Sequence, residues 1–258
     1  MKKKVLTTIA IVMSAVLLVV GSIAGTVAYL RSTAEVVNTF TYGKVAITMD
    51  ETLIGADGLK PATGNSQRVT GNRYKLMPGT TYVKDPVIHV GAESEDMYLF
   101  LKVDNGIAGL AVTDPAKQNL TIHNQLLANG WKVYTTEENV AYTTESTHTT
   151  NSGVVIKSTS TVYYLSVGAA AGENETPDSP KVVDGASGNI KTFESFTTGT
   201  DPVTEASMTA YVNNNAKISV LAFAVQTSGF NNNIHKAAEV FKTEFASAIP
   251  APTPAPAG

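Results

Sequence analysis

The strongest strand pattern in the chain is Lys217-Ile218-Ser219-Val220-Leu221-Ala222-Phe223-Ala224-Val225-Gln226. β-branched and aromatic residues recur in it, and these residues fit the pleated surface of a sheet. Because both of its faces carry apolar residues, we expect it to be a central strand. The small Ala222 and Ala224 share one face, which predicts close packing against another layer.

Similar patterns predict further strands along the chain. Val45, Ile47 and Met49 alternate with more polar neighbours, which is typical of a half-buried strand. Residues 97–103 are apolar on both faces and predict a second central strand. The strand predicted for residues 80–90 contains Asp85-Pro86, and proline places it at a sheet edge or a bulge. Shorter strands are predicted around residues 130–134, 154–156 and 161–167. The fold class is therefore all-β and mainly antiparallel.

Helices and loops are predicted in the remaining parts. Residues 120–128 form a short predicted helix. A C-terminal amphipathic helix begins at a cap residue, Asn232 or Asn233. Its apolar face is formed by Ile234, Ala238, Phe241 and Phe245. Residues 168–201 are rich in Gly, Pro, Asp and Thr and indicate a long surface loop.

Composition excludes several classes of protein. The chain has 258 residues, 43% of them hydrophobic, which is enough for one sizeable core. A net charge of −3 and the lack of a basic stripe argue against nucleic acid as a partner. The chain has no cysteine, so disulfides and thiol catalysis are both excluded.

The N-terminus has the features of an export signal. Lys2, Lys3 and Lys4 precede an uncharged apolar run from Val5 to Leu30. Small residues end the run and predict signal cleavage between Ala28 and Tyr29. The competing interpretation is an uncleaved membrane anchor, because the run exceeds the about 20 residues that span a bilayer. We therefore expect a signal peptide over residues 1–28, a secreted product, and membrane contact only through the uncleaved segment.

The order of several motifs resembles a known family. Lys-Lys-Lys is followed by Gly25-Thr26-Val27-Ala28-Tyr29 and then by Asn38, Phe40, Gly43, Val45 and Ile47 in the spacing Asn-x-Phe-x-x-Gly-x-Val-x-Ile. Met77-Pro78-Gly79, Lys84-Asp85-Pro86, Gly130-Trp131 and the segment 222–230 follow in order. This order resembles the proteins processed by SipW-type signal peptidase, the TasA and camelysin-like biofilm matrix proteins of Gram-positive bacteria. Residues 136–205 are not covered by the resemblance.

The resemblance implies a fold and a function. The expected domain is a jelly-roll-like β-sandwich over residues 29–249, with 136–205 as a divergent insertion and 250–258 as a Pro/Ala-rich tail. The expected function is that of a non-enzymatic structural protein of the extracellular matrix or cell surface. Its expected partners are a SipW-type signal peptidase and further copies of itself. The candidate donor strand for such self-association comprises Thr39, Phe40, Tyr42, Val45 and Ile47, with residues 29–40 favoured because the strand from Gly43 onward is expected to pair within its own domain.

Catalytic and metal-binding signals are weak. The four histidines include no His-Glu-x-x-His pair, and no Gly-x-Ser-x-Gly elbow occurs. His235 and Glu239 lie four residues apart, a spacing that suits one metal ion, but an exposed polar pair on a helix is favoured. The acidic pairs Asp50-Glu51 and Glu137-Glu138 are interpreted as solvated turns rather than calcium ligands. We therefore expect no catalytic, metal or cofactor site.

Two alternatives stay open at this point. The chain is alternatively a monomeric surface adhesin that binds glycan or protein through residues 136–205, with Trp131 and Tyr163-Tyr164 as a sugar-stacking platform. A camelysin-like metalloprotease is the less favoured alternative.

Overall fold

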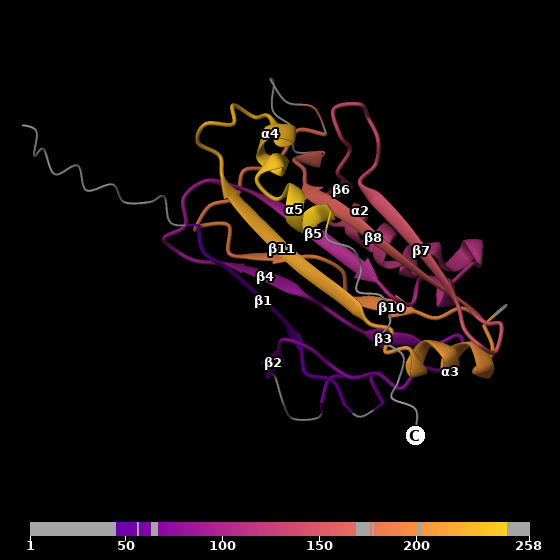
Figure 1. The fold of residues 1–258 in the computed structure, drawn as a ribbon. Helices are drawn as coiled ribbons and strands as arrows, with labels where there is room; N and C mark the ends of the chain where they lie inside the picture. Colours follow the sequence, from indigo (N-terminus) through magenta and orange to yellow (C-terminus); the bar gives the residue numbers. More distant parts are fainter. Residues whose placement is uncertain are drawn as a thin grey trace, which may run out of the picture. The chain divides into compact units, whose positions relative to one another are not determined.

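Antiparallel β-sheets make up most of the structure (Figure 1), a computed structural model. The structure describes residues 45–55, 57–62, 67–168, 176, 178–200 and 203–246, all within the compact unit Gly43–Gly258. The predicted signal peptide, its cleavage pair Ala28 and Tyr29, the tail 250–258 and the candidate donor residues Thr39, Phe40 and Tyr42 lie outside the described residues.

One sheet has five strands, in the order β11-β5-β8-β6 with β7 also pairing with β8. Their bounds are β5 (Met97–Asn105), β6 (Trp131–Val133), β7 (Thr143–Thr149), β8 (Val155–Leu165) and β11 (Ile218–Gln226). Strand β5 is central, as predicted, and all but its last residue are buried. The prediction that residues 217–226 form a central strand is wrong, because β11 pairs only with β5 among the described strands.

The other strands form a four-stranded sheet in the order β2-β1-β4-β9 and a two-stranded sheet of β10 and β3. Their bounds are β1 (Ile47–Thr52), β2 (Arg68–Val69), β3 (Thr81–Val83), β4 (Val87–Val90), β9 (Asn189–Lys191) and β10 (Ser195–Thr197). The strand predicted for residues 80–90 is interrupted at Asp85-Pro86, between β3 and β4, as predicted. Across this break, the N–H of Lys84 donates to the carbonyl of Glu194 (3.1 Å).

The segment predicted as a surface loop, residues 168–201, contributes to the core instead. It contains β9 and β10, which pair with β4 and β3. Val183 and Phe193 are almost fully buried. These strands are three residues long, which is too short for a periodic pattern. Pairing with distant strands of the same chain, rather than their local sequence, holds them in place.

One large apolar cluster draws residues from both the five-stranded sheet and the β1–β4 side. It includes Leu99 and Leu101 of β5, Ile88 of β4 and Phe196 of β10. Trp131 is 0% exposed, and its indole N–H donates to the carbonyl of Lys191 (2.9 Å). Because Tyr163 and Tyr164 are also buried, these three aromatic residues do not form the exposed sugar-stacking platform considered above.

The opposite face of the five-stranded sheet is covered by the C-terminal helices α4 (Ile234–Glu239) and α5 (Lys242–Ala246) (Figure 1). The expectation of a single amphipathic helix is therefore wrong, because this segment forms two short helices. Asn233 does cap α4, accepting a hydrogen bond from the N–H of Lys236 (3.0 Å). The turn between the helices brings the rings of Phe241 and Phe245 to 5.2 and 5.4 Å from Phe223, which explains the break.

Among the described residues, further helical segments between strands are the 3-10 helices η1 (Ala108–Leu110) and η2 (Pro115–Leu120), and the α-helices α2 (Ile122–Ala128) and α3 (Glu205–Asn213). Helix α2 confirms the helix predicted at residues 120–128. Helix α3 was not predicted, although Thr204 and Ser207 form a capping box at its start.

Candidate functional site

The outer edge of β11 is open in the described part of the chain. The carbonyl of Lys217 accepts from the N–H of Gly106 (2.9 Å), and the N–H of Thr227 donates to the backbone carbonyl of Asp96 (2.9 Å). Odd-numbered backbone groups therefore face β5, and hydrogen-bonding direction alternates along a strand. It follows that the N–H and C=O groups of Ile218, Val220, Ala222 and Ala224 point away from β5. No described strand pairs with them.

Strand β1 has an open edge of the same kind. The carbonyl of Ala46 accepts from the N–H of Gly91 (2.8 Å), so even-numbered groups face β4. Strand β2 covers the other side of β1 only at Glu51 and Thr52. Within the described residues, the backbone groups of Ile47 and Met49 on this side therefore have no strand partner.

The two open edges border one region, which we call the open side. Its apolar residues pack against the large core without being fully buried. They are Val45, Ile47 and Met49 before and in β1, and Ile218, Val220, Ala222 and Ala224 in β11. No residue of β11 is fully buried, whereas its neighbour β5 is buried over nearly its whole length. The structure thus leaves apolar surface and unpaired backbone together on the open side.

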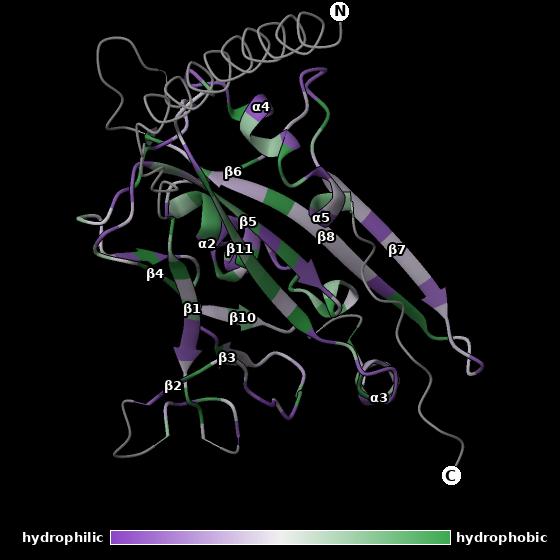
Figure 2. Ribbon diagram, turned by 60° about the vertical axis from the view of Figure 1, so that its left-hand side comes forward, coloured by the Kyte–Doolittle hydropathy of each residue, from purple (hydrophilic) through white to green (hydrophobic). Residues whose placement is uncertain are grey.

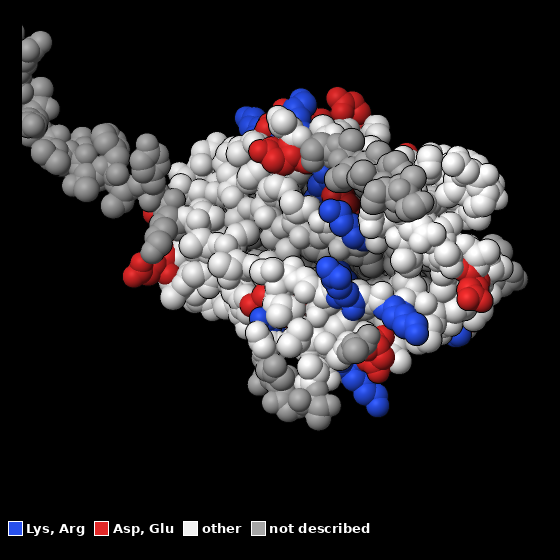
Figure 3. All heavy atoms as spheres, turned by 60° about the horizontal axis from the view of Figure 1, so that its bottom comes forward, with Lys and Arg blue, Asp and Glu red and all other residues white. Residues whose placement is uncertain are grey.

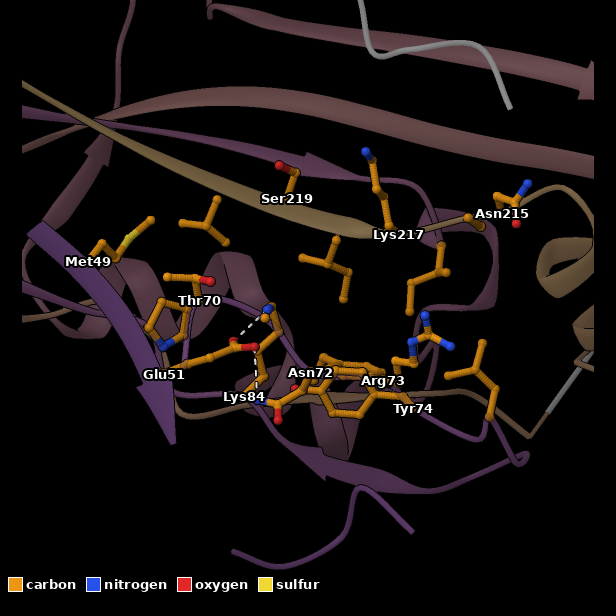
Figure 4. Close-up of a pocket in the computed structure, with 18 of the residues that line it drawn as sticks. Met49, Glu51, Thr70, Asn72, Arg73, Tyr74, Lys84, Asn215, Lys217 and Ser219 are labelled. Atoms are coloured by element: carbon orange, nitrogen blue, oxygen red, sulfur yellow. Dashed lines mark hydrogen bonds and ion pairs between the residues drawn. The ribbon is translucent and has the colours of Figure 1, made fainter. Parts of the chain in front are cut away.

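A cavity of about 600 Å³ lies at the open side, between the start of β11 and β1 with residues 70–76 (Figure 4). Ile218 and Val220 line it from β11, and Met49 lines it from β1. The cavity is therefore part apolar and part polar, and strand backbone forms two of its walls.

A buried ion pair forms the polar wall of this cavity. Lys84 Nζ lies 2.6 Å from Glu51 Oε2, and their side chains are only 9% and 5% exposed. Asn72 Nδ2 donates to the other oxygen of Glu51 (2.9 Å). Burial, together with the negative charge of Glu51, raises the pKa of Tyr74, whose hydroxyl donates to the carbonyl of Val83 (3.0 Å). These contacts fix β1 against the break between β3 and β4.

Two cations lie at one end of the cavity. Arg73 and Lys217 line it from opposite sides, and both are exposed. Neither side chain forms an ion pair with a described residue. Figure 3, which turns the β1–β3 side forward, shows Lys and Arg side chains bordering a hollow. This end of the cavity suits a ligand or chain segment that carries negative charge.

A second polar network lies beside the cavity and ties β1 to β4 and β2. Asp50 pairs with Arg68, and His89 Nε2 lies 2.8 Å from Asp50 Oδ1. Hydrogen bonds to Asp50 and to Asn189 raise the pKa of His89. Burial acts to raise the pKa of Asp50, but the hydrogen bonds from Arg68 and His89 outweigh it and lower that pKa. The network therefore favours a protonated His89.

Of the candidate donor residues, the structure describes Val45 and Ile47, and both belong to the fold of their own chain. Ile47 pairs with Val90 of β4 in its own chain, and Val45 packs against the same core. Strand donation would therefore fall to the segment before Gly43, which lies outside the described residues.

The candidate metal pair does not acquire further ligands in the described structure. His235 is half-buried, 5.8 Å in ring-centroid distance from Tyr134, and Glu239 is exposed and paired with Lys242. The described residues contain no cluster of three or more His, Asp or Glu side chains that could hold a metal ion. Asp50 and Glu51 are engaged in the ion pairs described above.

The interpretation of Asp50-Glu51 as a solvated turn is wrong, because both residues lie in β1 and Glu51 is buried. Sequence reasoning also missed the pairing of Glu51 with Lys84. These two residues are separated by strands β2 and β3 and their loops, and no local pattern predicts such a pair. The signal that was available is the charged Lys84 inside a predicted strand, beside the Asp85-Pro86 break.

Comparisons with protein-family models, with curated proteins and with solved structures each found no match to this chain. Among the described helices, none has both the length and the apolar character needed to cross a bilayer.

Proposed function

We propose that the chain is a secreted, non-enzymatic structural protein of the extracellular matrix or cell surface, with a jelly-roll-like β-sandwich domain. We further propose that it assembles by strand donation after signal cleavage between Ala28 and Tyr29. In this assembly, residues 29–42 of one copy enter the open side of the next copy. The observation that carries the proposal is the open side itself, which combines two free strand edges with half-buried apolar side chains.

The physical argument rests on what an added strand would supply. An inserted strand gives partners to the outward N–H and C=O groups of β11 and removes Ile218, Val220, Ala222 and Ala224 from water. The segment 29–42 has suitable residues, including Val36, Val37, Phe40 and Tyr42. At about 3.3 Å per residue its fourteen residues extend to about 46 Å, against about 30 Å for the nine residues of β11.

The geometry of repetition follows from the position of the two parts. Donor and acceptor are different surfaces of one chain, so each contact is head-to-tail. Repeated head-to-tail contacts that do not close into a ring produce a filament. The resemblance to the TasA and camelysin-like proteins agrees with a matrix role.

The test compares a protein that starts at Tyr29 with one that starts at Gly43, by negative-stain electron microscopy and sedimentation. The described fold and both apolar clusters lie within Gly43–Gly258, so the shorter protein keeps every contact described above. Filaments are expected from the first protein and no filaments from the second. The absence of filaments from both proteins would overturn the proposal.

A peptide assay identifies the acceptor. A synthetic peptide of residues 29–42 should bind the protein that starts at Gly43, whereas a scrambled peptide should not. Val220→Lys places a charge on the open side, and Leu221→Lys places one on the opposite, exposed face of the same strand. Binding is expected to be lost in the first variant and kept in the second. Equal binding by both would place the acceptor elsewhere.

A further inference from the structure

Strand β7 is a second free edge of the five-stranded sheet, on the side away from β11. All seven of its residues are exposed, from Thr143 to Thr149. It pairs with the first part of β8 and with no other described strand. Figures 1 and 2 both show it at the margin of the sheet, and Figure 2 shows its hydrophilic character.

The hydrogen bonds of the hairpin define which backbone groups are free. The N–H of Val162 donates to the carbonyl of Tyr142 (3.0 Å), and the N–H of Thr150 donates to Val154 (2.9 Å). Even-numbered groups of this strand therefore face β8. The N–H and C=O groups of Glu145, Thr147 and Thr149 face outward, and no described strand pairs with them.

The edge lacks the features that usually prevent edge-to-edge pairing. Natural edge strands are protected by proline, lysine, bulges or short length. The sequence Thr143-Thr144-Glu145-Ser146-Thr147-His148-Thr149 contains no proline and no lysine. It pairs with β8 in continuous register over seven residues, so it has no bulge. Its one acidic residue, Glu145, already lies 3.2 Å from Lys157 of β8.

We propose that β7 pairs with β7 of a second copy, antiparallel about a twofold axis at Ser146. In this register Glu145 lies opposite Thr147 of the second copy, and Thr143 lies opposite Thr149. Glu145, Thr147 and Thr149 present outward N–H and C=O groups, which meet the same groups of the second copy, whereas Thr143 presents only its C=O because its N–H donates to the carbonyl of Ala141 (2.8 Å). Glu145 faces a neutral residue, so no like charges lie directly opposite. The strand thus complements itself in both hydrogen bonding and charge.

This dimer is independent of strand donation, since it uses the other edge of the sheet. In filaments it would join neighbouring filaments sideways, and in a protein without residues 29–42 it would give a dimer. The contact is polar and exposed in the monomer, so its formation is reversible.

Cysteine cross-linking tests the register directly, because the chain has no cysteine of its own. Ser146 would face Ser146 of the second copy as a non-hydrogen-bonded pair, with Cα atoms about 4.5 Å apart, within disulfide range. Thr144 is on the same strand and the same face, but it would lie about 13 Å from its own counterpart. In the protein starting at Gly43, Ser146→Cys should oxidise to a disulfide dimer at least about tenfold faster than Thr144→Cys. Equal rates for the two variants would overturn the proposal.

A pair of charge variants gives a second readout. Both variants are made together with Lys157→Ser, because Lys157 lies directly opposite residue 147 in the same hairpin. In this background Thr147→Lys places a cation opposite Glu145 of the second copy, twice per dimer, and should tighten the dimer about fivefold in sedimentation equilibrium. Thr147→Glu places like charges opposite each other and should weaken it by a similar factor. A wild-type protein that stays monomeric at about millimolar concentration, or variants that shift in the same direction, would refute the pairing. Both measurements use a protein without residues 29–42, so failure of strand donation does not affect them.

Discussion

Replacing Lys84 with Met removes the cation from a buried ion pair at the open side. Lys84 Nζ and Glu51 Oε2 are 2.6 Å apart, and their side chains are 9% and 5% exposed. Met has a similar length and shape, so packing of the aliphatic stem is largely kept. What changes is that the Glu51 carboxylate stays buried with the amide of Asn72 as its remaining side-chain donor.

The expected loss of stability follows from this burial. Breaking a buried pair by removing one partner costs about 3–5 kcal/mol, because an uncompensated charge stays in the interior. Since Asn72 keeps its hydrogen bond to Glu51, we expect the lower end, about 3 kcal/mol. For a chain of this size, that corresponds to a decrease in Tm of roughly 6–12 °C.

A double variant separates charge from packing. With Glu51→Gln added to Lys84→Met, neither position of the pair carries a charge, and the side-chain carbonyl of the new glutamine can still accept from Asn72. The loss should then fall to about 1 kcal/mol, because replacing both partners of a buried pair is often nearly neutral. Lys75→Met, at an exposed lysine, is the control and should change stability by about 0.5 kcal/mol or less.

Urea unfolding of the protein starting at Gly43, followed by circular dichroism, measures these differences. A loss below about 1 kcal/mol in Lys84→Met would refute the reasoning, because burial would then carry no penalty. A double variant as unstable as the sum of its single variants would refute it too, since it would show that the two groups do not interact.

Three further predictions concern other parts of the fold. Because hydrogen bonds to Asp50 and Asn189 raise the pKa of His89 above its ordinary value of 6.5, its contribution is complete below that value and is lost as pH rises through the raised pKa. The stability difference between wild type and His89→Gln should therefore be larger at about pH 5.5 than at about pH 8.5, and equal differences by urea unfolding would contradict this. Leu101→Ala, at a residue 0% exposed in the core, should cost about 2–5 kcal/mol in the same assay, against less than about 1 kcal/mol for the exposed Leu127→Ala. Asn233→Ala should lower the free energy of unfolding by about 1 kcal/mol through loss of the α4 cap, and an unchanged value would show that the cap is replaced.

The parts of the fold that sequence predicts well are those with a local cause. The alternation of Ile47 and Met49 gives β1 its half-buried face. The apolar run of β5 predicts its central place, and the Asn233 side chain predicts the start of α4. In each case the residues that determine the element lie within it or directly before it.

The parts that sequence predicts poorly depend on a distant partner. Strands β5 and β11 are both nine residues long and mainly apolar, yet one is central and the other lies at an edge. Strand β5 is central because β8 pairs with its other edge, whereas no described strand pairs with the outer edge of β11. The sequence of neither strand predicts this difference. For the same reason the sequence does not predict β9 and β10. Each is three residues long and becomes a strand only by pairing, β9 with β4 and β10 with β3. Nor does it predict the ion pair of Glu51 and Lys84, which exists only once β1 lies beside the β3–β4 break.

The outer edges of β11 and β7 differ in chemistry, and that difference determines the relative strength of the two proposed contacts. Strand β11 exposes half-buried apolar residues, so filling its edge removes apolar surface from water as well as pairing backbone groups. Strand β7 exposes Thr, Ser, Glu and His on both faces, so pairing there exchanges hydrogen bonds with water for hydrogen bonds with protein, at little net gain. A contact at β11 should therefore persist on dilution, and a contact at β7 should dissociate. Dilution of an assembled sample would accordingly separate the filaments from one another before it shortens them, and shortening first would contradict this assignment of the two edges.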